Sequence, residues 1–315
     1  MGGPLGGVSP PPIWQDGSNG IDQGAREPAR ERRDRLLEKA EGRGEAGSPS
    51  QAAGLRVAVT WPRGEGTRRE QQARELARAE NLPLLPRGDL SLKELWRDFD
   101  ALLVLEDRGL TLVWPQGRWR FHPNMAAVRI KRLLAGQRDP LVEALCLRPG
   151  DRLLDATLGL GSDAIIAAHV VGPSGSVLAC EAAPLVAMVV EWGLRHWQGQ
   201  PPELVEAMRR IQVLRRPHLE VLRSLPARSL DCVYFDPMFR RPRLASEPLW
   251  PLRFFASQAP LQGEALQEAL RVARRRVVVR EQAGSPEFAR LGIRHFVPEG
   301  RRKGVVYGWL QPVSS

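Results

Sequence analysis

The sequence predicts a doubly wound α/β fold, in which helices cover both faces of a mostly parallel sheet, joined to a small N-terminal α/β domain. After residue 150, short apolar segments alternate with helical patterns, which is typical of strands buried on both faces and connected by helices. Two glycines, Gly159 and Gly161, directly follow the first of these strands. The chain ends with strand-like segments at 293–300 and 304–310, which predict an antiparallel hairpin that completes a seven-stranded, Rossmann-like sheet.

The composition is that of a folded protein, since 43% of the 315 residues are hydrophobic and 26% are charged. Residues 1–54 are rich in Gly, Pro and Ser, and we expect them to be disordered or loosely ordered. No segment is apolar over the roughly 20 residues that span a bilayer. The N-terminus also lacks the basic and apolar regions of a secretory signal. We therefore expect a cytoplasmic protein without a membrane partner.

The net charge of +10 favours a polyanionic partner. Residues 1–54 hold seven Lys/Arg and eight Asp/Glu, so the excess lies in the rest of the chain. A folded body this basic suits nucleic acid, although an arginine-rich composition is an alternative explanation. The three cysteines, Cys146, Cys180 and Cys232, are far apart and lie in apolar segments, which predicts buried thiols and no metal site.

The N-terminal α/β domain is expected at 55–124 and leads into a linking helix at 125–138. Ser91 and Glu94 form the capping-box pattern at the start of a helix. The strands that we expect here span 55–61, 101–107, 110–116 and 117–122, and the helices span 67–82, 91–99 and 125–137.

The second domain is expected at 139–315 and begins with a short helix at 139–147. The expected parallel strands span 151–157, 176–181, 211–215, 230–236 and 275–280. The expected helices between them span 162–171, 183–198, 203–210, 218–225 and 261–273.

The glycine turn after the strand at 151–157 indicates a site for a nucleoside-bearing cofactor. Gly159 and Gly161 permit positive φ and let a ligand approach the bare backbone. In an open α/β sheet this turn faces the crevice at the carboxyl ends of the strands, where ligands bind. Glu181, twenty residues after Gly161, ends the next strand, and its carboxylate can accept both hydroxyls of a ribose.

The same glycine pattern also matches a dinucleotide fingerprint, so the cofactor has to be chosen on charge. Asp163 lies in the first helical turn, where it would repel a pyrophosphate, and Asp155 adds a second carboxylate. S-Adenosyl-L-methionine has no phosphate and carries a sulfonium and an ammonium, so we favour it over NAD(P) and an oxidoreductase. The predicted cofactor residues are Asp155, Thr157, Gly159, Gly161, Ser162, Asp163 and Glu181.

A second motif follows the apolar strand at 230–236, which ends in Asp236-Pro237-Met238-Phe239. It resembles the signature of methyltransferases that modify amino groups conjugated to a ring or a carbonyl. Such an amine is a poor nucleophile because its lone pair is delocalised. Asp236 and the carbonyl of Pro237 could accept hydrogen bonds from the amine, and Phe239 could stack on a flipped-out base. We predict these three residues to be catalytic, with DNA bases and protein amides as alternative acceptors to RNA.

The segments DATLGLGSDA (155–164) and VYFDPMF (233–239) together resemble the RsmJ family of bacterial small-subunit ribosomal RNA guanine-N2 methyltransferases. The chain is even more similar to the YpiP-like group related to that family, also over FHPNMAAVRIKRLLAGQRDPLVEA (121–144). The resemblance spans roughly 55–310. It implies a class I methyltransferase that modifies an exocyclic amine, guanine N2 favoured, in ribosomal RNA.

By this resemblance Asp236 holds the acceptor amine, while five residues line the cofactor: Asp155, Gly159, Gly161, Asp163 and Glu181. After the third strand, Pro217 and His218 stand where many relatives place an acid, so the adenine contact stays unassigned.

Two groups of basic residues are predicted to contact RNA phosphates. One group is Arg129, Lys131 and Arg132, for which a solvated helix face is the alternative; the other is Arg240, Arg241 and Arg243. A non-catalytic RNA-binding module is a further alternative function, and the sequence does not fix an oligomeric state.

Overall fold

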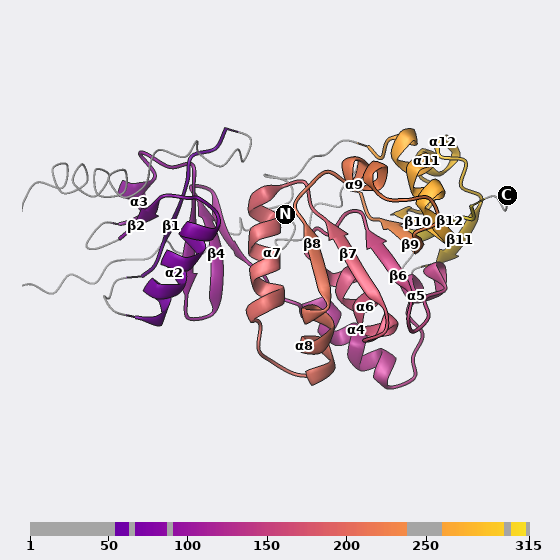
Figure 1. Ribbon diagram of the computed structural model, residues 1–315, viewed down its shortest axis with the longest axis horizontal. Coiled ribbons are helices and arrows are strands. Elements are labelled where there is room, and N and C mark those ends of the chain that lie inside the picture. The colour runs from indigo at the N-terminus through magenta and orange to yellow at the C-terminus, as the bar shows by residue number, and fades with distance from the viewer. Residues whose placement is uncertain (1–53, 63–66, 87–90, 238–259, 299–303, 313–315) are drawn as a thin grey trace, which may run out of the picture.

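The computed structural model describes residues 54–62, 67–86, 91–237, 260–298 and 304–312. The strands form two sheets, one small and one large, and helix α7 (Pro184–His196) lies between them (Figure 1). Residues of α7 pack against β4 (Gly109–Trp114) of the small sheet and β8 (Ile211–Leu214) of the large one.

The small sheet has five strands in the order β2-β1-β3-β4-β5. Strand β1 pairs in parallel with β2 and β3, whereas β3, β4 and β5 form an antiparallel meander. Its remaining elements are β1 (Val57–Thr60), α2 (Arg68–Ala79), β2 (Leu84–Leu85), α3 (Leu92–Leu95), β3 (Ala101–Glu106) and β5 (Gly117–Arg120). The predicted capping box is present, since Ser91 and Glu94 bond each other's backbone N–H groups. The predicted helix at 91–99 is shorter than expected, and the two-residue strand β2 was not predicted.

The large sheet has the strand order β11-β12-β10-β9-β6-β7-β8. Five neighbouring strands are parallel, and at one edge β12 pairs antiparallel with both β10 and β11, which confirms the predicted seven-stranded layout with a terminal antiparallel hairpin. Its other strands are β6 (Arg152–Asp155), β7 (Ser176–Cys180), β9 (Leu230–Phe235), β10 (Ala273–Gln282), β11 (His295–Pro298) and β12 (Val305–Leu310).

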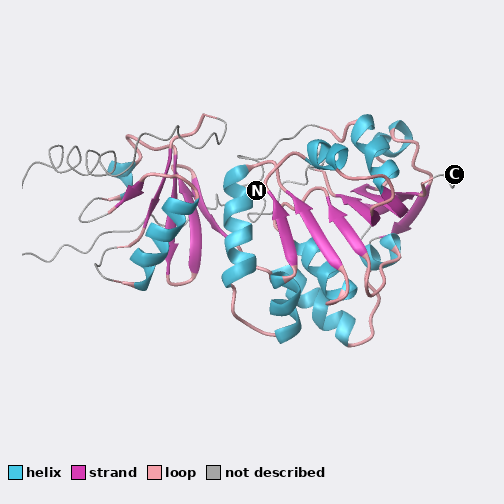
Figure 2. Ribbon diagram, in the orientation of Figure 1, coloured by secondary structure: helices cyan, strands magenta, loops and turns pink. Residues whose placement is uncertain are grey.

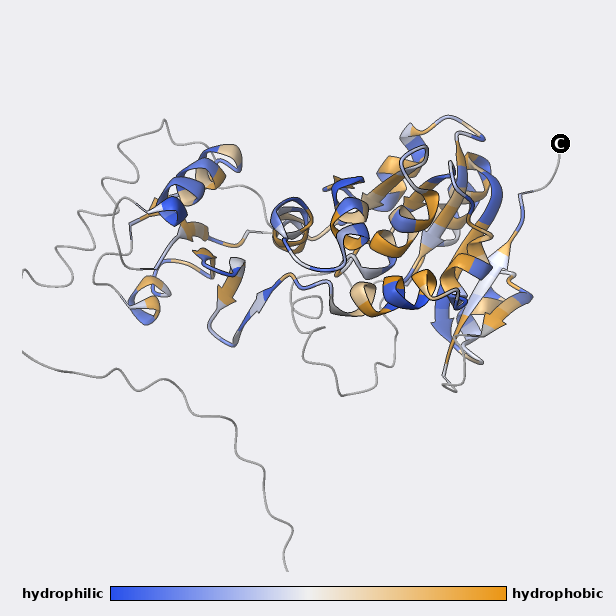
Figure 3. Cartoon of the chain, turned by 90° about the horizontal axis from the view of Figure 1, so that it is seen from below, coloured by the Kyte–Doolittle hydropathy of each residue, from blue (hydrophilic) through white to orange (hydrophobic). Residues whose placement is uncertain are grey.

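Helices cover both faces of the large sheet (Figure 2). One apolar layer joins the sheet to a first group of helices through residues such as Leu153 and Tyr234, and a second layer uses their neighbours Leu154 and Val233. Successive side chains of a strand point to opposite faces, so apolar residues at adjacent positions fill two layers at once. Figure 3 shows apolar residues along these strands and on the helices packed against them. The first group is α4 (Asn124–Leu134), α5 (Pro140–Leu145), α6 (Ser162–Val171), α7 and α8 (Pro202–Arg209); the second is α9 (His218–Ser224), α11 (Gly263–Val272) and α12 (Pro286–Arg290).

The first apolar layer continues from the large sheet into the small one. Trp114 and Phe121, from the end of the small sheet, belong to the same buried cluster as Val186 and Val190 of α7. The ring of Phe121 lies directly against Gly193 of α7, where a β-carbon would overlap it. The absence of a side chain at this position therefore lets the two sheets share one core. The domain limits at 124 and 138 stay predictions.

Candidate active site

The turn after β6 is shaped by two glycines in the left-handed region. Gly159 has a φ of 50° and Gly161 a φ of 80°, conformations that strain a residue with a β-carbon. Gly161 precedes the first residue of α6, Ser162, whose hydroxyl oxygen is buried and has no hydrogen-bond partner among the described residues. A β-carbon on Gly161 would also lie 3.2 Å from Cγ1 of Val190 in α7. Glycine is therefore required here by conformation and by close packing.

Asp155 ends β6 with a carboxylate that is almost fully buried, at 1% exposure. Its Oδ1 accepts a hydrogen bond of 3.0 Å from the backbone N–H of Thr157. Its Oδ2 is buried and has no hydrogen-bond partner within the described part of the chain. Burial raises the pKa of Asp155 well above its ordinary value, and the nearby carboxylates of Asp163, Asp236 and Glu181 add to this effect. Such an oxygen fits a cationic ligand group, as the ammonium of S-adenosyl-L-methionine would provide.

Glu181 follows β7 and is buried at 8% exposure. It accepts hydrogen bonds from the backbone N–H groups of Gly159, at 3.0 Å, and Ala183, at 2.9 Å. The side chain thus joins the turn after β6 to the turn after β7, and burial raises its pKa. Each carboxylate oxygen has a second lone pair, so ribose hydroxyls can still donate to it.

Asp163, in the first turn of α6, is held by two partners on other elements. Arg129 of α4 donates to its Oδ1, and the hydroxyl of Tyr234 in β9 donates to its Oδ2 across 2.9 Å. Although burial raises the pKa of Asp163, the Arg129 cation, helped by Arg280, brings it below its ordinary value. The repulsion of a pyrophosphate, expected from an isolated Asp163, is therefore weakened by Arg129.

Asp236 stands directly after β9, which pairs with β6. Its backbone N–H donates to the hydroxyl of Thr157 across 2.6 Å, so the acceptor motif is tied to the glycine turn. Its Oδ2 accepts a hydrogen bond of 2.8 Å from Arg280 of β10. Arg280 was not predicted as a site residue, and only the pairing of β9 with β10 could have identified it. Pro237 lines a small hollow together with Val279 and Glu281.

His218 begins α9, in the segment where the adenine contact was left unassigned. Its ring meets the ring of Phe235 edge to face, with 5.5 Å between centroids. Burial lowers the pKa of His218, so the neutral imidazole is favoured.

The residues predicted to contact RNA fall into three groups. Lys131 and Arg132 are exposed on α4. Arg129 is only 16% exposed and forms ion pairs with Asp139 and Asp163, so its guanidinium does not lie on the exposed surface with Lys131 and Arg132. Its guanidinium is occupied inside the protein by two carboxylates. The predicted residues Phe239, Arg240, Arg241 and Arg243 lie outside the described residues.

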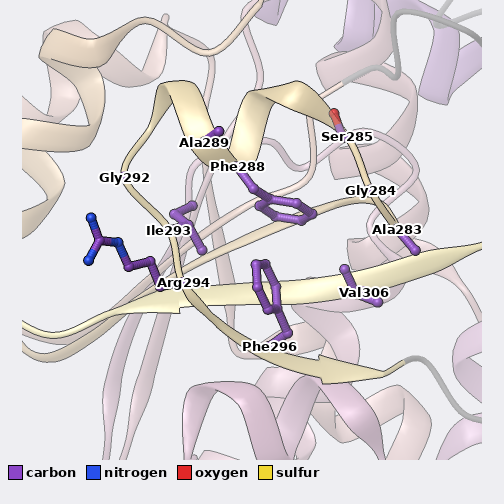
Figure 4. Close-up of a pocket in the computed structure, with 10 residues that line it drawn as sticks. All are labelled: Ala283, Gly284, Ser285, Phe288, Ala289, Gly292, Ile293, Arg294, Phe296 and Val306. Carbon is purple, nitrogen blue, oxygen red and sulfur yellow. The ribbon is translucent and has the colours of Figure 1, made fainter.

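Other features of the described residues offer fewer groups that could bind a polar ligand or a metal. An apolar hollow of about 650 Å³ lies beside α12, lined by Phe288, Phe296 and Ile293 (Figure 4), and none of the residues that line it belongs to the glycine turn. The described part of the chain has no cluster of metal-binding side chains. No helix within the described ranges is long and apolar enough to cross a membrane.

The cysteines differ from the expectation at one position. Cys180 and Cys232 are buried, and burial raises the pKa of both thiols to about 12. Cys146, the residue after α5, has a left-handed backbone conformation and is exposed, so the prediction of a buried thiol is wrong there.

The strand order separates this sheet from the dinucleotide-binding fold. In that fold the strands follow the order 3-2-1-4-5-6. Here β12 is inserted between β10 and β11 and runs antiparallel to both. This insertion does not support the oxidoreductase alternative.

Comparisons with known proteins agree with this geometry. A family model described as "Putative SAM-dependent methyltransferase" matches residues 118–295. "Uncharacterized protein YpiP" of Bacillus subtilis is 41% identical over 222 residues, which cover 70% of this chain and 86% of that protein. "Ribosomal RNA small subunit methyltransferase J" of Pseudomonas syringae pv. tomato is 31% identical over 202 residues, 60% of this chain and 72% of that protein.

A crystal structure of a SAM-dependent methyltransferase from Neisseria gonorrhoeae has the same fold. The TM-score is 0.56 at 19% identity, over 82% of this chain and 97% of that one. The chain therefore belongs to the family of SAM-dependent methyltransferases, and its cofactor is S-adenosyl-L-methionine.

Proposed function

We propose that this methyltransferase modifies an exocyclic amino group of a base in ribosomal RNA, with guanine N2 as the favoured atom. The observation that carries the proposal is the position of Asp236. Its carboxylate follows β9, next to the strand that bears the glycine turn, and its backbone is bonded to Thr157 of that turn. A carboxylate beside the cofactor turn is the group that an amino acceptor requires.

The choice of RNA rests on charge and on relatives. The chain carries a net charge of +10, which favours binding to phosphates. Relatives named "Ribosomal RNA small subunit methyltransferase J" in Pseudomonas syringae and Pseudomonas aeruginosa are 31% and 29% identical to it. These similarities support ribosomal RNA as the substrate class.

S-Adenosyl-L-methionine, when bound, supplies an electrophilic methyl group on a sulfonium. Asp155 is suited to its ammonium, because Oδ2 is buried without a partner among the described residues, and Glu181 is suited to its ribose hydroxyls. We propose that Asp236 accepts a hydrogen bond from the acceptor amine and that the carbonyl of Pro237 accepts a second one. These contacts aim the nitrogen lone pair at the methyl carbon.

Positioning then supplies most of the rate, because an in-line displacement needs both reactants held close and aligned. The bond between Asp236 and Thr157 keeps the acceptor motif and the cofactor turn at a fixed separation. As the bond from nitrogen to the methyl carbon forms and the bond from that carbon to sulfur breaks, the nitrogen becomes positively charged. The Asp236 carboxylate stabilises that charge until the nitrogen releases a proton to solvent.

The test uses purified protein, labelled cofactor and small ribosomal subunits from a strain that lacks the gene. We expect label in ribosomal RNA and a methylated guanine on mass spectrometry of its nucleosides. Asp236→Ala should bind the cofactor as the wild type does in calorimetry, yet lose methyl transfer. Asp231→Asn, at the opposite end of the same strand, is the matched control and should stay active. Full activity in Asp236→Ala would contradict the assigned acceptor site.

Parallel incubations with DNA and with a protein fraction decide among the alternative acceptors. Label in either fraction, with none in RNA, would replace ribosomal RNA by a DNA base or a protein amide. Binding to RNA without any transfer would instead indicate a non-catalytic module.

A further inference from the structure

Asp236 and Arg280 form an ion pair across the two strands at the acceptor side of the site. In the parallel pairing of β9 and β10, Phe235 lies opposite Val279, so the next residue on each strand is Asp236 and Arg280. A guanidinium nitrogen of Arg280 lies 2.8 Å from Oδ2 of Asp236. The two side chains are 23% and 25% exposed, so this pair is only partly screened by solvent.

Acidic and phenolic groups surround this pair. The guanidinium lies 6.0 Å from the ring centroid of Tyr307 in β12. Burial lowers the pKa of Arg280, but Asp236, Tyr234, Asp163 and Tyr307 outweigh this effect and raise it. Arg280 is therefore a permanent cation at this end of the sheet.

Asp236 in turn belongs to a group of neighbouring acids. Its charge raises the pKa of Asp155 on β6 and of Tyr234 on β9. Carboxylates that share a partly buried site repel one another, and one of them takes up a proton unless a cation is nearby. The Arg280 guanidinium is a cation that bonds Asp236 directly.

The proposed chemistry needs Asp236 as an acceptor in a fixed orientation. A protonated carboxyl would offer an O–H to the amine, and a freely rotating one would hold the amine in many orientations. A guanidinium bonded to one oxygen prevents both. We propose that Arg280 is a positioning residue for methyl transfer, which keeps the Asp236 carboxylate ionised and oriented towards the acceptor amine. This inference rests on the acceptor role proposed for Asp236.

The same two strands provide a matched control. At their opposite ends, Arg274 of β10 lies 3.6 Å from Asp231 of β9. This pair has the same residue types on the same strands but lies at the amino-terminal ends of these strands, away from the glycine turn. Arg274→Met should therefore reproduce any general effect of losing an arginine from β10.

The first experiment measures Asp236 directly and needs no RNA. The protein is labelled with carbon-13 at aspartate carboxyls, Asp236→Asn identifies the Asp236 signal, and pH titrations follow it by NMR. In Arg280→Met we expect the pKa of Asp236 to rise by about one unit or more. Arg280→Lys should give a smaller rise, and Arg274→Met should give none.

The second experiment measures methyl transfer to small-subunit ribosomal RNA over a range of pH. In Arg280→Met we expect kcat to fall roughly 10- to 100-fold, the usual effect of losing a hydrogen bond to a charged group, with little change in the KM for S-adenosyl-L-methionine. The acid limb of the kcat profile should move to higher pH together with the NMR titration. Arg280→Lys should restore part of the rate. In an Asp236→Asn background Arg280→Met should cost little, because the two residues act through one contact.

An unchanged Asp236 titration in folded Arg280→Met would overturn the inference, whatever the substrate is. A shifted titration in a protein that methylates no RNA would refute the proposed function but leave the role of Arg280 intact. If Arg280→Met does not fold, Arg280→Gln, which removes the charge but keeps hydrogen-bond donors, takes its place with the same expected rise. An equal effect of Arg274→Met would also overturn the inference.

Discussion

The backbone N–H of Asp236 donates a hydrogen bond to the hydroxyl of Thr157 across 2.6 Å. Thr157 belongs to the turn after β6, and Asp236 to the turn after β9, the neighbouring strand. Asp155, two residues before Thr157, accepts a bond from the Thr157 backbone and so fixes the same turn. A short chain of bonds therefore connects the cofactor side of the site to the acceptor side.

Thr157→Val is expected to lower kcat without unfolding the protein. Valine has nearly the same shape but offers no acceptor, so the N–H of Asp236 loses its partner at a cost of about 1–3 kcal/mol. The acceptor motif then shifts relative to the cofactor turn, and kcat should fall roughly 10- to 100-fold. Thr157→Ser keeps the hydroxyl and should retain most of the rate. Steady-state kinetics on both variants provide the measurement, and equal rates would show that this bond has no role in catalysis.

Cofactor binding is expected to strengthen as pH rises. Burial, with the carboxylates of Asp163, Asp236 and Glu181, raises the pKa of Asp155, so the carboxyl of the free protein keeps a proton above the ordinary aspartate range. A bound ammonium favours the ionised carboxylate, so binding releases this proton. The affinity should therefore increase with pH up to the raised pKa and level off there, until the ammonium of the cofactor itself loses its proton. Calorimetry in buffers with different ionisation enthalpies measures both the affinity and the number of protons released.

Two variants assign that proton. Asp155→Asn should bind the cofactor more weakly and lose the pH dependence that Asp155 contributes. Burial also raises the pKa of Glu181, so Glu181→Gln should weaken binding but keep the contribution of Asp155. The same pH dependence in Asp155→Asn and the wild type would place the titrating group elsewhere.

Gly193→Ala is expected to destabilise the protein, because the added methyl group overlaps the ring of Phe121. Both residues are packed in the core that joins the two sheets, and overpacking of this kind costs roughly 1–3 kcal/mol. The melting temperature should fall. Gly263→Ala is the control, since its β-carbon would meet nothing within 4 Å and its φ is not positive. A Gly193→Ala protein as stable as the control would show that the core around Phe121 can relax.

The cofactor turn could be predicted from sequence because its determinants are local. An apolar strand, two glycines and a carboxylate at the end of the next strand lie within thirty residues. Each of these features has the same structural role in any parallel sheet that binds a nucleoside. The elements that were missed, β2 and α12, have two and five residues, which is too short for a hydrophobic period to appear.

The ion pairs could not be predicted in this way. Arg280 meets Asp236 only through the register of β9 and β10, and the two residues are 44 positions apart in sequence. Arg129 was grouped with Lys131 and Arg132 because they are adjacent in sequence. On a helix of 3.6 residues per turn Lys131 points away from Arg129, whereas Arg132, three residues on, lies on nearly the same face. Only tertiary packing therefore decides that Arg129 and not Arg132 meets the buried carboxylates.

Arg129 and Arg132 are therefore expected to give opposite phenotypes. Arg129→Met leaves the carboxylates of Asp139 and Asp163 without their cation, and the loss of one partner of a buried ion pair costs about 3–5 kcal/mol. Chemical denaturation should show this loss, while Arg132→Met, on the exposed surface of α4, should unfold at the wild-type denaturant concentration. If Arg132 contacts a phosphate, as proposed, RNA-binding assays at several salt concentrations should show the larger loss of affinity, and a smaller salt dependence, in Arg132→Met. Wild-type RNA affinity in Arg132→Met would favour the solvated-face interpretation of α4, and wild-type stability in Arg129→Met would contradict the structural role given to Arg129.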